Sequence, residues 1–211
     1  IPVSGPAVGT PVYPDASGYL EHVDVPRLQR QAVKCGLRVR LAVLPGSYVG
    51  PTRALCHLAP LDPDAAPPAP DALEAFAQAF TIGHHRQFDD DPRFGMLVLS
   101  EIACRALSPG INDSGTAISV LGSLRRLFED AARADKHKQR EDPGEKDEPA
   151  RCDRVAVPAL ELDALFDDAF SAIARDGAGS VQVVLFLLRH LGELAHHGPA
   201  MRACAQLHAD L

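Results

Sequence analysis

Four aliphatic residues alternate with polar or small residues in the run LRVRLAVL, at positions 37–44. Side chains of a strand point alternately to its two faces, so this period of two predicts a half-buried strand with Arg38 and Arg40 on one face. Residues 17–23 (SGYLEHV) and 52–58 (TRALCHL) predict two further strands. The start of the chain is therefore rich in predicted β-structure.

A short helix is predicted over residues 24–36 (DVPRLQRQAVKCG), where Asp24 can cap the first turn and Gly36 can end the last. Residues 1–60 are accordingly predicted to form a small β-rich module with one short helix. The following segment, residues 61–71 (LDPDAAPPAPD), is rich in proline and alanine and is predicted to be an extended linker.

Helical spacing dominates the remaining residues, 72–211, which we predict to be a helical domain of about five helices. Asp71 and Glu74 resemble a capping box, and apolar residues up to Phe80 follow at helical spacing. Asp91 and Pro92 can start a helix over residues 92–107, whose apolar side chains cover most of its circumference, so we expect it to be central and buried. Residues around 134–151 are densely charged and are predicted to be a disordered loop. The predicted fold class is α+β, a hybrid-barrel-like module followed by a helical bundle.

A cluster of turn-forming and small polar residues, SPGINDSGT at positions 108–116, separates two strongly apolar helices. Asn112 tolerates a left-handed backbone, and Asp113 can accept hydrogen bonds from the amides of the following helix. We expect this corner to be buried at the centre of the fold. Two interpretations remain open: a helix–helix corner in which these groups only satisfy helix ends, or a contact site for a ligand or subunit. The candidate residues of that site are Glu101, Arg105, Ser108, Asn112, Asp113 and Thr116.

The motifs SGYLEHVD, LAVLPGSYVGP and FDDDPRFGMLVLSEIACRALSPGIND, followed by Thr116 and Ala117, resemble a known family. It is the soluble C-terminal region of the bacterial membrane-protein family known as domain of unknown function 2254. Several transmembrane helices precede this region in that family, so the resemblance implies a membrane-embedded part in the same protein. The family pattern has proline after the Asn-Asp pair, whereas Ser114 and Gly115 follow it here. The resemblance implies no particular chemistry.

The segment LPGSYVGPTRALCHL, residues 44–58, is also similar to the turn-and-strand signature of lipoyl and biotinyl carrier domains and related hybrid barrels. Those carriers present a lysine at a hairpin tip, and no Met-Lys or Asp-Lys-Ala hairpin occurs here. The similarity therefore favours a scaffold or docking barrel over a carrier.

Imidazole and carboxylate groups gather at His84, His85, Asp89, Asp90 and Asp91, and such groups suit divalent metal ions. Adjacent histidines on a helix point about 100° apart, so both reach one ion only if the helix has ended near Gly83. A solvated acidic turn with Asp91 as a helix cap is the alternative that we favour. We predict no cofactor, because nucleotide, carrier and nucleophile motifs are missing.

The net charge of -7 and the interleaving of acidic and basic residues argue against nucleic acid as a partner. The longest apolar runs are shorter than the roughly 18 to 20 residues that cross a bilayer, so we expect no membrane span in this chain. The 5 cysteines are far apart in the sequence, which is typical of reduced thiols and favours the cytoplasmic face of a bacterial inner membrane. The chain opens abruptly without methionine, so we expect a longer protein around it.

The functional hypothesis that follows is a noncatalytic soluble domain of a channel-like or transporter-like membrane protein, which assembles subunits or senses a small ligand or ion. The apolar helices over residues 92–107 and 181–191 exceed the needs of one modest core and indicate a homo-oligomer. The alternative is a metal-assisted hydrolase that uses His84, His85 and the run Asp89–Asp91. The sequence leaves enzymatic activity undecided and favours its absence.

Overall fold

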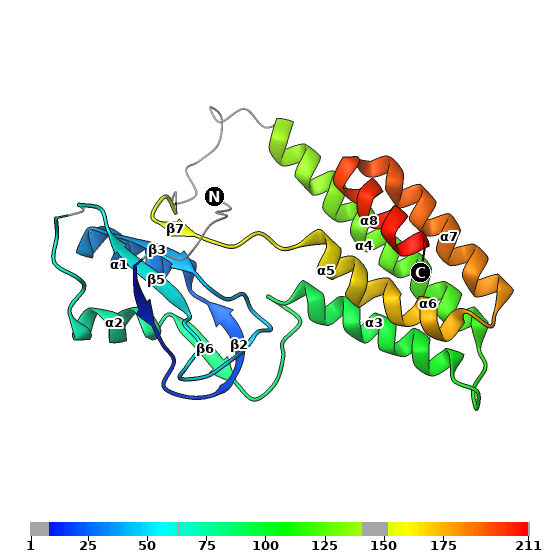
Figure 1. The fold of residues 1–211 in the computed structure, drawn as a ribbon, viewed down its shortest axis with the longest axis horizontal. Helices are drawn as coiled ribbons and strands as arrows, with labels where there is room; N and C mark the ends of the chain where they lie inside the picture. Colours follow the sequence, from blue (N-terminus) through cyan, green and yellow to red (C-terminus); the bar gives the residue numbers. More distant parts are fainter. Residues whose placement is uncertain (1–8, 63, 141–151, 211) are drawn as a thin grey trace. The chain divides into compact units, whose positions relative to one another are not determined.

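The computed structural model describes residues 9–62, 64–140 and 152–210. The described chain divides into two compact units, each with its own apolar core. The first unit contains the residues up to Phe94 together with segment 152–160, and the second contains the other described residues. Strands and helices are both present (Figure 1), so the predicted α+β class is confirmed.

Two sheets make up the strand-containing unit. The first has the order β1 (Thr10–Val12), β5 (Cys56–Pro60), β3 (Leu37–Leu41) and β7 (Val155–Ala156). The second has the order β4 (Tyr48–Val49), β2 (Gly18–Val23) and β6 (Phe80–Gly83). Only the β3–β7 pair is parallel among the pairs of the described strands.

The alternating pattern of β3 has the expected consequence in the structure. Leu37, Val39 and Leu41 are buried, whereas Arg38 is exposed. Val39 lies opposite Leu58 of β5 on one side and Val155 of β7 on the other. The aliphatic face of β3 therefore forms the centre of the core of this unit.

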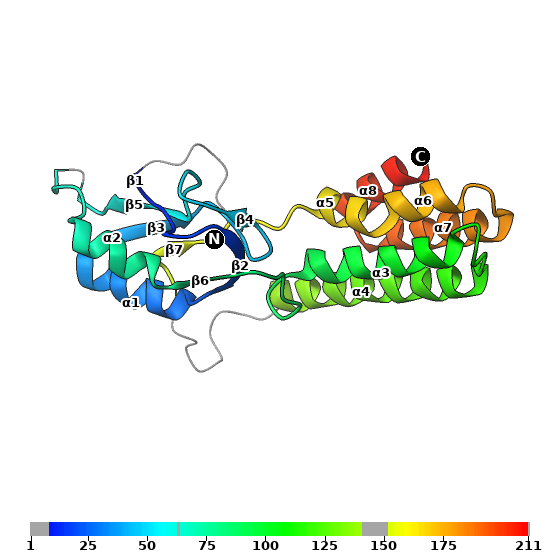
Figure 2. The ribbon, with the colours of Figure 1, turned by 90° about the horizontal axis from the view of Figure 1, so that it is seen from below.

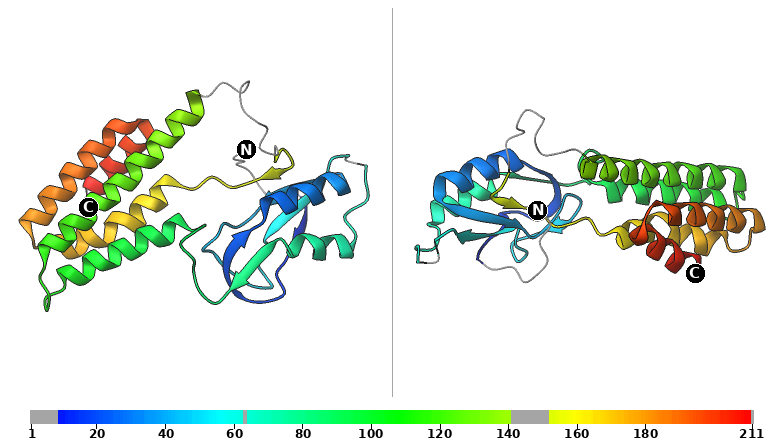
Figure 3. Two further views of the ribbon diagram at one scale, coloured as in Figure 1. Left: turned by 180° about the vertical axis from the view of Figure 1, so that it is seen from behind. Right: turned by 90° about the horizontal axis from the view of Figure 1, so that it is seen from above.

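Helix α1 (Val25–Cys35) is bounded by the residues that its sequence predicts. Asp24 Oδ1 accepts a hydrogen bond from the Arg27 amide at 2.8 Å, which satisfies one free donor of the first turn. Gly36 adopts a left-handed φ of 64°, a conformation that glycine reaches without steric cost. The helix packs against β3 and β7, and Figure 3 shows it beside the strands.

The first unit extends well beyond the predicted boundary at residue 60. Helix α2 (Pro70–Ala77) belongs to it, because Phe76 is fully buried in the same core as the strands. The N-cap of α2 is Ala69, without a side-chain hydrogen bond, so Asp71 and Glu74 form no capping box. Phe80 belongs to β6, not to a helix. Segment 61–71 thus connects elements within one unit instead of joining two domains, and the predicted start of the helical domain at residue 72 was wrong.

The second unit is helical (Figure 2). It contains α3 (Pro92–Leu107) from Gly95 onward, α4 (Ser114–Arg140), α5 (Leu162–Phe166), α6 (Ala172–Gly177), α7 (Val181–Leu194) and α8 (Pro199–Ala209). A π-helical turn (Asp167–Ser171) joins α5 to α6, and a 3₁₀ turn (Ala195–His197) follows α7. Helix α4 continues to Arg140 through the first part of the segment that we predicted to be disordered, and residues 141–151 lie outside the described residues.

Aromatic side chains fill the centre of this helical unit. The ring centroids of Phe128 and Phe166 are 4.5 Å apart, and those of Phe128 and Phe170 are 5.6 Å apart. All three rings are almost completely buried. Such ring pairs stabilise a core beyond their burial of area, so this cluster joins α4 to α5 and to the π-helical turn.

Candidate functional site

The corner between α3 and α4 is held by hydrogen bonds at both helix ends. Asp113 Oδ1 accepts from the Thr116 amide at 3.0 Å, and the Thr116 hydroxyl donates to the other carboxylate oxygen. These hydrogen bonds hold the pKa of Asp113 below its usual value. At the end of α3 the Ser108 hydroxyl donates to the Arg105 carbonyl at 2.7 Å. Asn112 has a φ of 51°, the left-handed conformation that asparagine tolerates.

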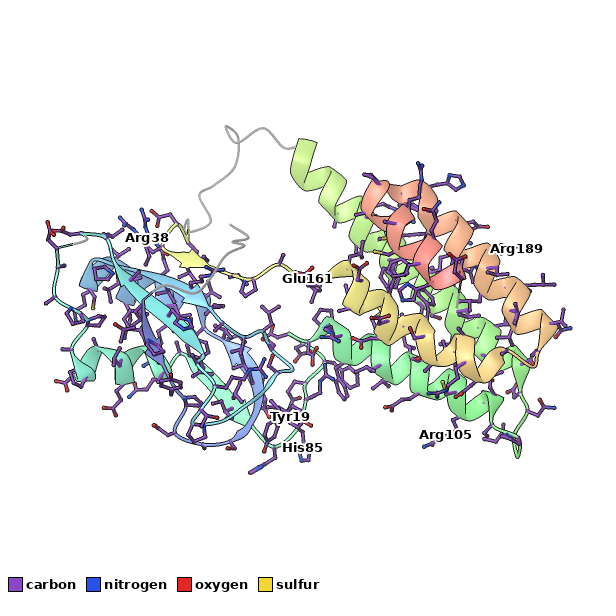
Figure 4. The ribbon with its side chains drawn as sticks, in the orientation of Figure 1. Tyr19, Arg38, His85, Arg105, Glu161 and Arg189 are labelled. Carbon is purple, nitrogen blue, oxygen red and sulfur yellow. The ribbon has the colours of Figure 1, made fainter. Side chains whose placement is uncertain are left out.

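The expectation that this corner is buried was wrong. Asn112 and Asp113 are exposed, and so are Glu101 and Arg105 on α3. Figure 4 shows Arg105 pointing away from the neighbouring helices. Helix α3 buries only one side, through Met96, Ser100, Ala103 and Ala106, whereas Ile102 is 45% exposed. The corner residues bond to one another and to the main chain of their own helix ends, and they do not converge with Glu101.

The proposed metal ligands are likewise kept apart. His84 and His85 are exposed just after β6 ends at Gly83, and His85 projects from the edge of the strand unit in Figure 4. Asp90 pairs with His22 of β2. Asp91 is buried and serves as the cap of α3. No group of three or more metal-ligating side chains gathers anywhere in residues 9–62, 64–140 and 152–210. The hydrolase alternative therefore has no assembled metal site in the described chain.

A cleft of about 470 Å³ lies within the helical unit, between α3 and the segment from the π-helical turn to α6. Its walls combine hydroxyl, carboxylate, guanidinium and aliphatic groups. They are Leu97, Ser100, Glu101, Cys104, Asp167, Asp168, Ser171, Ala172 and Arg175. One predicted site residue, Glu101, therefore lines a cleft. The other residues of this cleft were not among the predicted site residues.

Ser100 is the most buried polar residue of this cleft. It is 2% exposed, and its hydroxyl is a hydrogen-bond partner of the Cys104 thiol on the same helix. One turn further along α3, burial raises the pKa of Cys104 to about 11, and a hydrogen bond with Asp176 adds to the rise. The Cys104 thiol is therefore protonated at neutral pH and is no nucleophile.

The π-helical turn places carboxylates on the opposite wall of the cleft. Asp167 Oδ1 lies 2.9 Å from Nε2 of His208, which is buried on α8, and 3.3 Å from the Ser171 hydroxyl. The sequence FDDAFS continues a helical pattern without interruption, so nothing in it signals a π-turn. The site was missed for this reason: it depends on a local change of helix type and on the approach of α3.

Helix α7 presents an apolar stripe on its outer surface. Val181 is 74% exposed, Leu185 is 61% exposed and Leu188 is 42% exposed. Their spacing of four and then three residues, with exposed Gly192 four residues later, places them along one line of the helix. Figure 4 shows Arg189, the neighbour of Leu188, on the outer side of α7. We call Val181, Leu185, Leu188 and Gly192 the α7 stripe.

The inner side of α7 carries a polar network instead. Arg125 of α4 pairs with Glu129 at 2.7 Å and with Glu193 of α7. Its guanidinium also lies 3.4 Å from Nδ1 of His190, which is 8% exposed. Burial lowers the pKa of His190, and the charge of Arg125 acts in the same direction.

None of the helices in the described part of the chain combines the length and the apolar character that crossing a bilayer requires. A family model with the description "Predicted membrane protein (DUF2254)" matches residues 2–193. The chain is 35% identical over 125 residues to the uncharacterised proteins Mb1321c of Mycobacterium bovis and Rv1290c of Mycobacterium tuberculosis. The match covers 58% of this chain but only 24% of each relative. No solved structure matches the chain.

Proposed function

Because the chain belongs to the DUF2254 family of predicted membrane proteins, we propose that it is a noncatalytic assembly domain attached to the membrane-embedded part of a longer protein. The match covers only about a quarter of each mycobacterial relative, which is compatible with further segments in the full-length protein. In this proposal the domain joins copies of that protein into a homo-oligomer.

The observation that carries the proposal is the α7 stripe. Burying a fully exposed leucine side chain stabilises an interface by about 1.5–3 kcal/mol, so several aligned aliphatic side chains left in water are costly. The spacing of the stripe is that of the a and d positions of a coiled-coil seam. Gly192 adds room for the close approach of a facing helix, because it lacks a side chain.

A second copy of the same helix is the occupant that this stripe suits best. Two copies of α7 related by a twofold axis would bury Leu185 and Leu188 of each against the other, so one surface serves both partners. Arg189 and Gln182 flank the stripe and are exposed, which leaves polar groups at the rim of such an interface.

Size-exclusion chromatography with light scattering over a range of concentrations tests this proposal. The chain is expected to form an oligomer that Leu185→Glu or Leu188→Glu dissociates, because a carboxylate in the seam has no partner. Leu207→Glu is the matched control, since Leu207 of α8 is also 61% exposed but lies outside the stripe. A chain that is strictly monomeric at every concentration, or one that Leu207→Glu dissociates equally, would overturn the proposal.

We further propose that the domain lies on the cytoplasmic face of the bacterial inner membrane, which the free thiols of Cys35, Cys56, Cys104 and Cys204 support. Cys35 is exposed at the end of α1 and can report the side. In intact cells that make the full-length protein, a membrane-impermeant maleimide should label Cys35 only after the cells are opened. Labelling of intact cells that disappears in the Cys35→Ser variant would place the domain on the outer face instead.

A further inference from the structure

We propose that the outer face of the sheet β4–β2–β6 binds a quaternary ammonium group, through the rings of Tyr19 and Tyr48 and the carboxylate of Glu21. The ligand class is a nitrogen cation surrounded by methyl groups, carried on a free molecule or on the head group of a lipid. This inference goes beyond the assembly proposal, because it concerns the other unit of the chain and uses none of the residues of the α7 stripe.

The first argument is the placement of two tyrosine rings on the open face of this sheet. Tyr19 of β2 lies directly opposite Tyr48 of β4 in the strand register. The adjacent pair, Gly18 and Val49, is buried, so strand alternation turns the two tyrosines to the outside. Tyr48 is 58% exposed, and Figure 4 shows Tyr19 at the surface of the strand-containing unit.

The second argument is the angle between the two rings. Their centroids are 5.2 Å apart, and their planes meet at 83°. Two perpendicular rings form a corner with two π-faces, and the negative face of each ring attracts a cation within about 6 Å of its centroid. Aromatic arrangements of this kind recognise quaternary ammonium groups.

The third argument is the position of the Glu21 carboxylate. Gly83 of β6 lies opposite Tyr19 on the other side of β2, and a Cβ atom placed on Gly83 would lie 1.9 Å from Glu21 Oε1. Directly opposite residues of neighbouring strands point to the same face of the sheet. The carboxylate therefore occupies the space of the missing side chain, beside Tyr19, and the face carries two rings and one negative charge in a row.

A β-bulge directs Glu21 to this place. The register of β2 and β6 shifts between Leu20 and His22, so Glu21 is the extra residue, and bulges of this kind re-aim side chains next to functional sites. Glu21 is only partly exposed, yet it makes no ion pair or hydrogen bond with any residue that the structure describes. The guanidinium of Arg53 donates to the main-chain carbonyl of Tyr48 at 2.9 Å, on β4, so β2 separates it from the carboxylate over β6.

The same groups distinguish a quaternary ammonium ion from other cations. In the described chain no three metal-ligating side chains gather, and a single carboxylate does not enclose a metal ion. A primary ammonium group has three N–H donors, which one carboxylate and two π-faces leave partly unsatisfied. A quaternary ammonium group has no N–H donor, so a π-face and one carboxylate meet all of its requirements.

Tyrosine fluorescence can follow the binding, because the 211-residue chain has 3 tyrosines and no tryptophan. Titration with tetramethylammonium chloride should give a saturable change with a dissociation constant of about 1–10 mM. Sodium chloride at equal ionic strength should give none, because the sodium ion is strongly hydrated. The uncharged tert-butanol should also give none, because it has a similar shape without the charge. Equal responses to tetramethylammonium and tert-butanol, or a change that does not saturate, would overturn the inference.

Variants assign the binding to these side chains. Tyr48→Leu should abolish the saturable change, whereas Tyr48→Phe should keep it, because the ring and not the hydroxyl binds the cation. Glu21→Gln should weaken binding by about two- to fivefold, the effect of one exposed ion pair. Tyr13→Leu is the matched control, since Tyr13 is 46% exposed but lies outside this row. Loss of binding in Tyr13→Leu and not in Tyr48→Leu would contradict the site.

Flotation of the chain with vesicles distinguishes the two sources of the ligand. Flotation with phosphatidylcholine vesicles that Tyr48→Leu abolishes would identify a lipid head group. Saturable binding of tetramethylammonium without flotation would identify a free quaternary ammonium compound, and either result supports the site. Flotation with phosphatidylglycerol vesicles alone, together with no response to tetramethylammonium, would overturn it.

Discussion

The guanidinium of Arg86 lies 2.7 Å from the carboxylate of Asp91, which is only 2% exposed. The same carboxylate accepts a hydrogen bond from the Phe94 amide at 3.1 Å and so caps α3. Arg86 also lies over the Phe94 ring, 5.0 Å from its centroid. Asp91, which the sequence suggested as a metal ligand, instead forms an ion pair with Arg86 and caps α3. These interactions lie at the end of the strand-containing unit.

Replacing Asp91 should therefore destabilise the fold. Asp91→Ala removes a helix cap and leaves the Arg86 charge half-buried without its partner, so we expect a loss of about 2 kcal/mol in the free energy of unfolding. Urea denaturation measures the loss. Asp89→Ala is the control, because Asp89 is exposed, and an equal effect of both substitutions would contradict this role of Asp91.

Replacing Gly46 by any residue with a side chain should destabilise the fold. Its φ is 86°, and a Cβ atom placed on it would lie 2.0 Å from Asp91 Oδ2. Gly46→Ala combines strain in the left-handed region with this overlap, so it should cost about 1–3 kcal/mol. Gly110→Ala, at a corner position with open space around it, should leave the thermal midpoint nearly unchanged. Similar midpoints for the two variants would show that the close approach of Gly46 and Asp91 does not exist.

The aromatic cluster predicts a large effect of truncating Phe128. Phe128→Ala leaves a cavity beside Phe166 and Phe170, and substitutions of this kind cost about 3–5 kcal/mol. The adjacent Leu127 is 45% exposed, so Leu127→Ala should cost less than about 1 kcal/mol. Chemical denaturation measures both costs, and equal costs for the two variants would contradict the role of Phe128 at the centre of this core.

His190 should make stability depend on pH. Burial lowers its pKa in the folded chain below the usual 6.5, and Arg125 and Arg189 act in the same direction while Glu193 and Glu129 oppose it. As the pH falls below about 6.5, the unfolded chain binds a proton at His190 that the folded chain does not yet bind. Stability contributed by neutral His190 is therefore present above this pH and is lost as the pH falls through it.

The variant His190→Gln removes that proton uptake. The difference in unfolding free energy between wild type and His190→Gln should therefore shrink as the pH is lowered from neutral towards 5. Exposed His196 provides the control variant His196→Gln for the general effect of losing a histidine. A wild-type advantage over His190→Gln that stays constant across this range would exclude the predicted linkage.

Features that depend on neighbouring residues were predictable from the order of amino acids. The burial of Val39 next to the exposed Arg38 follows from strand alternation, and the ends of α1 follow from the chemistry of Asp24 and Gly36. The start of α3 at Asp91 and Pro92 is of the same kind. In each case the stabilising partner lies within a few residues along the chain, so the pattern itself contains the interaction.

Features that join distant residues were not predictable in this way. Strand β6 belongs to the first unit because it pairs with β2, and β7 belongs to it because it pairs with β3. The sequence around Phe76 shows only that this side chain prefers a core, and it does not show which of the two cores contains it. The cleft at Ser100 exists only because a π-helical turn from another segment faces α3. Hydrophobic burial is not directional, so the local sequence determined only which residues prefer to be buried. The packing of segments that are distant in the sequence decided which core, or which surface, each of these residues belongs to.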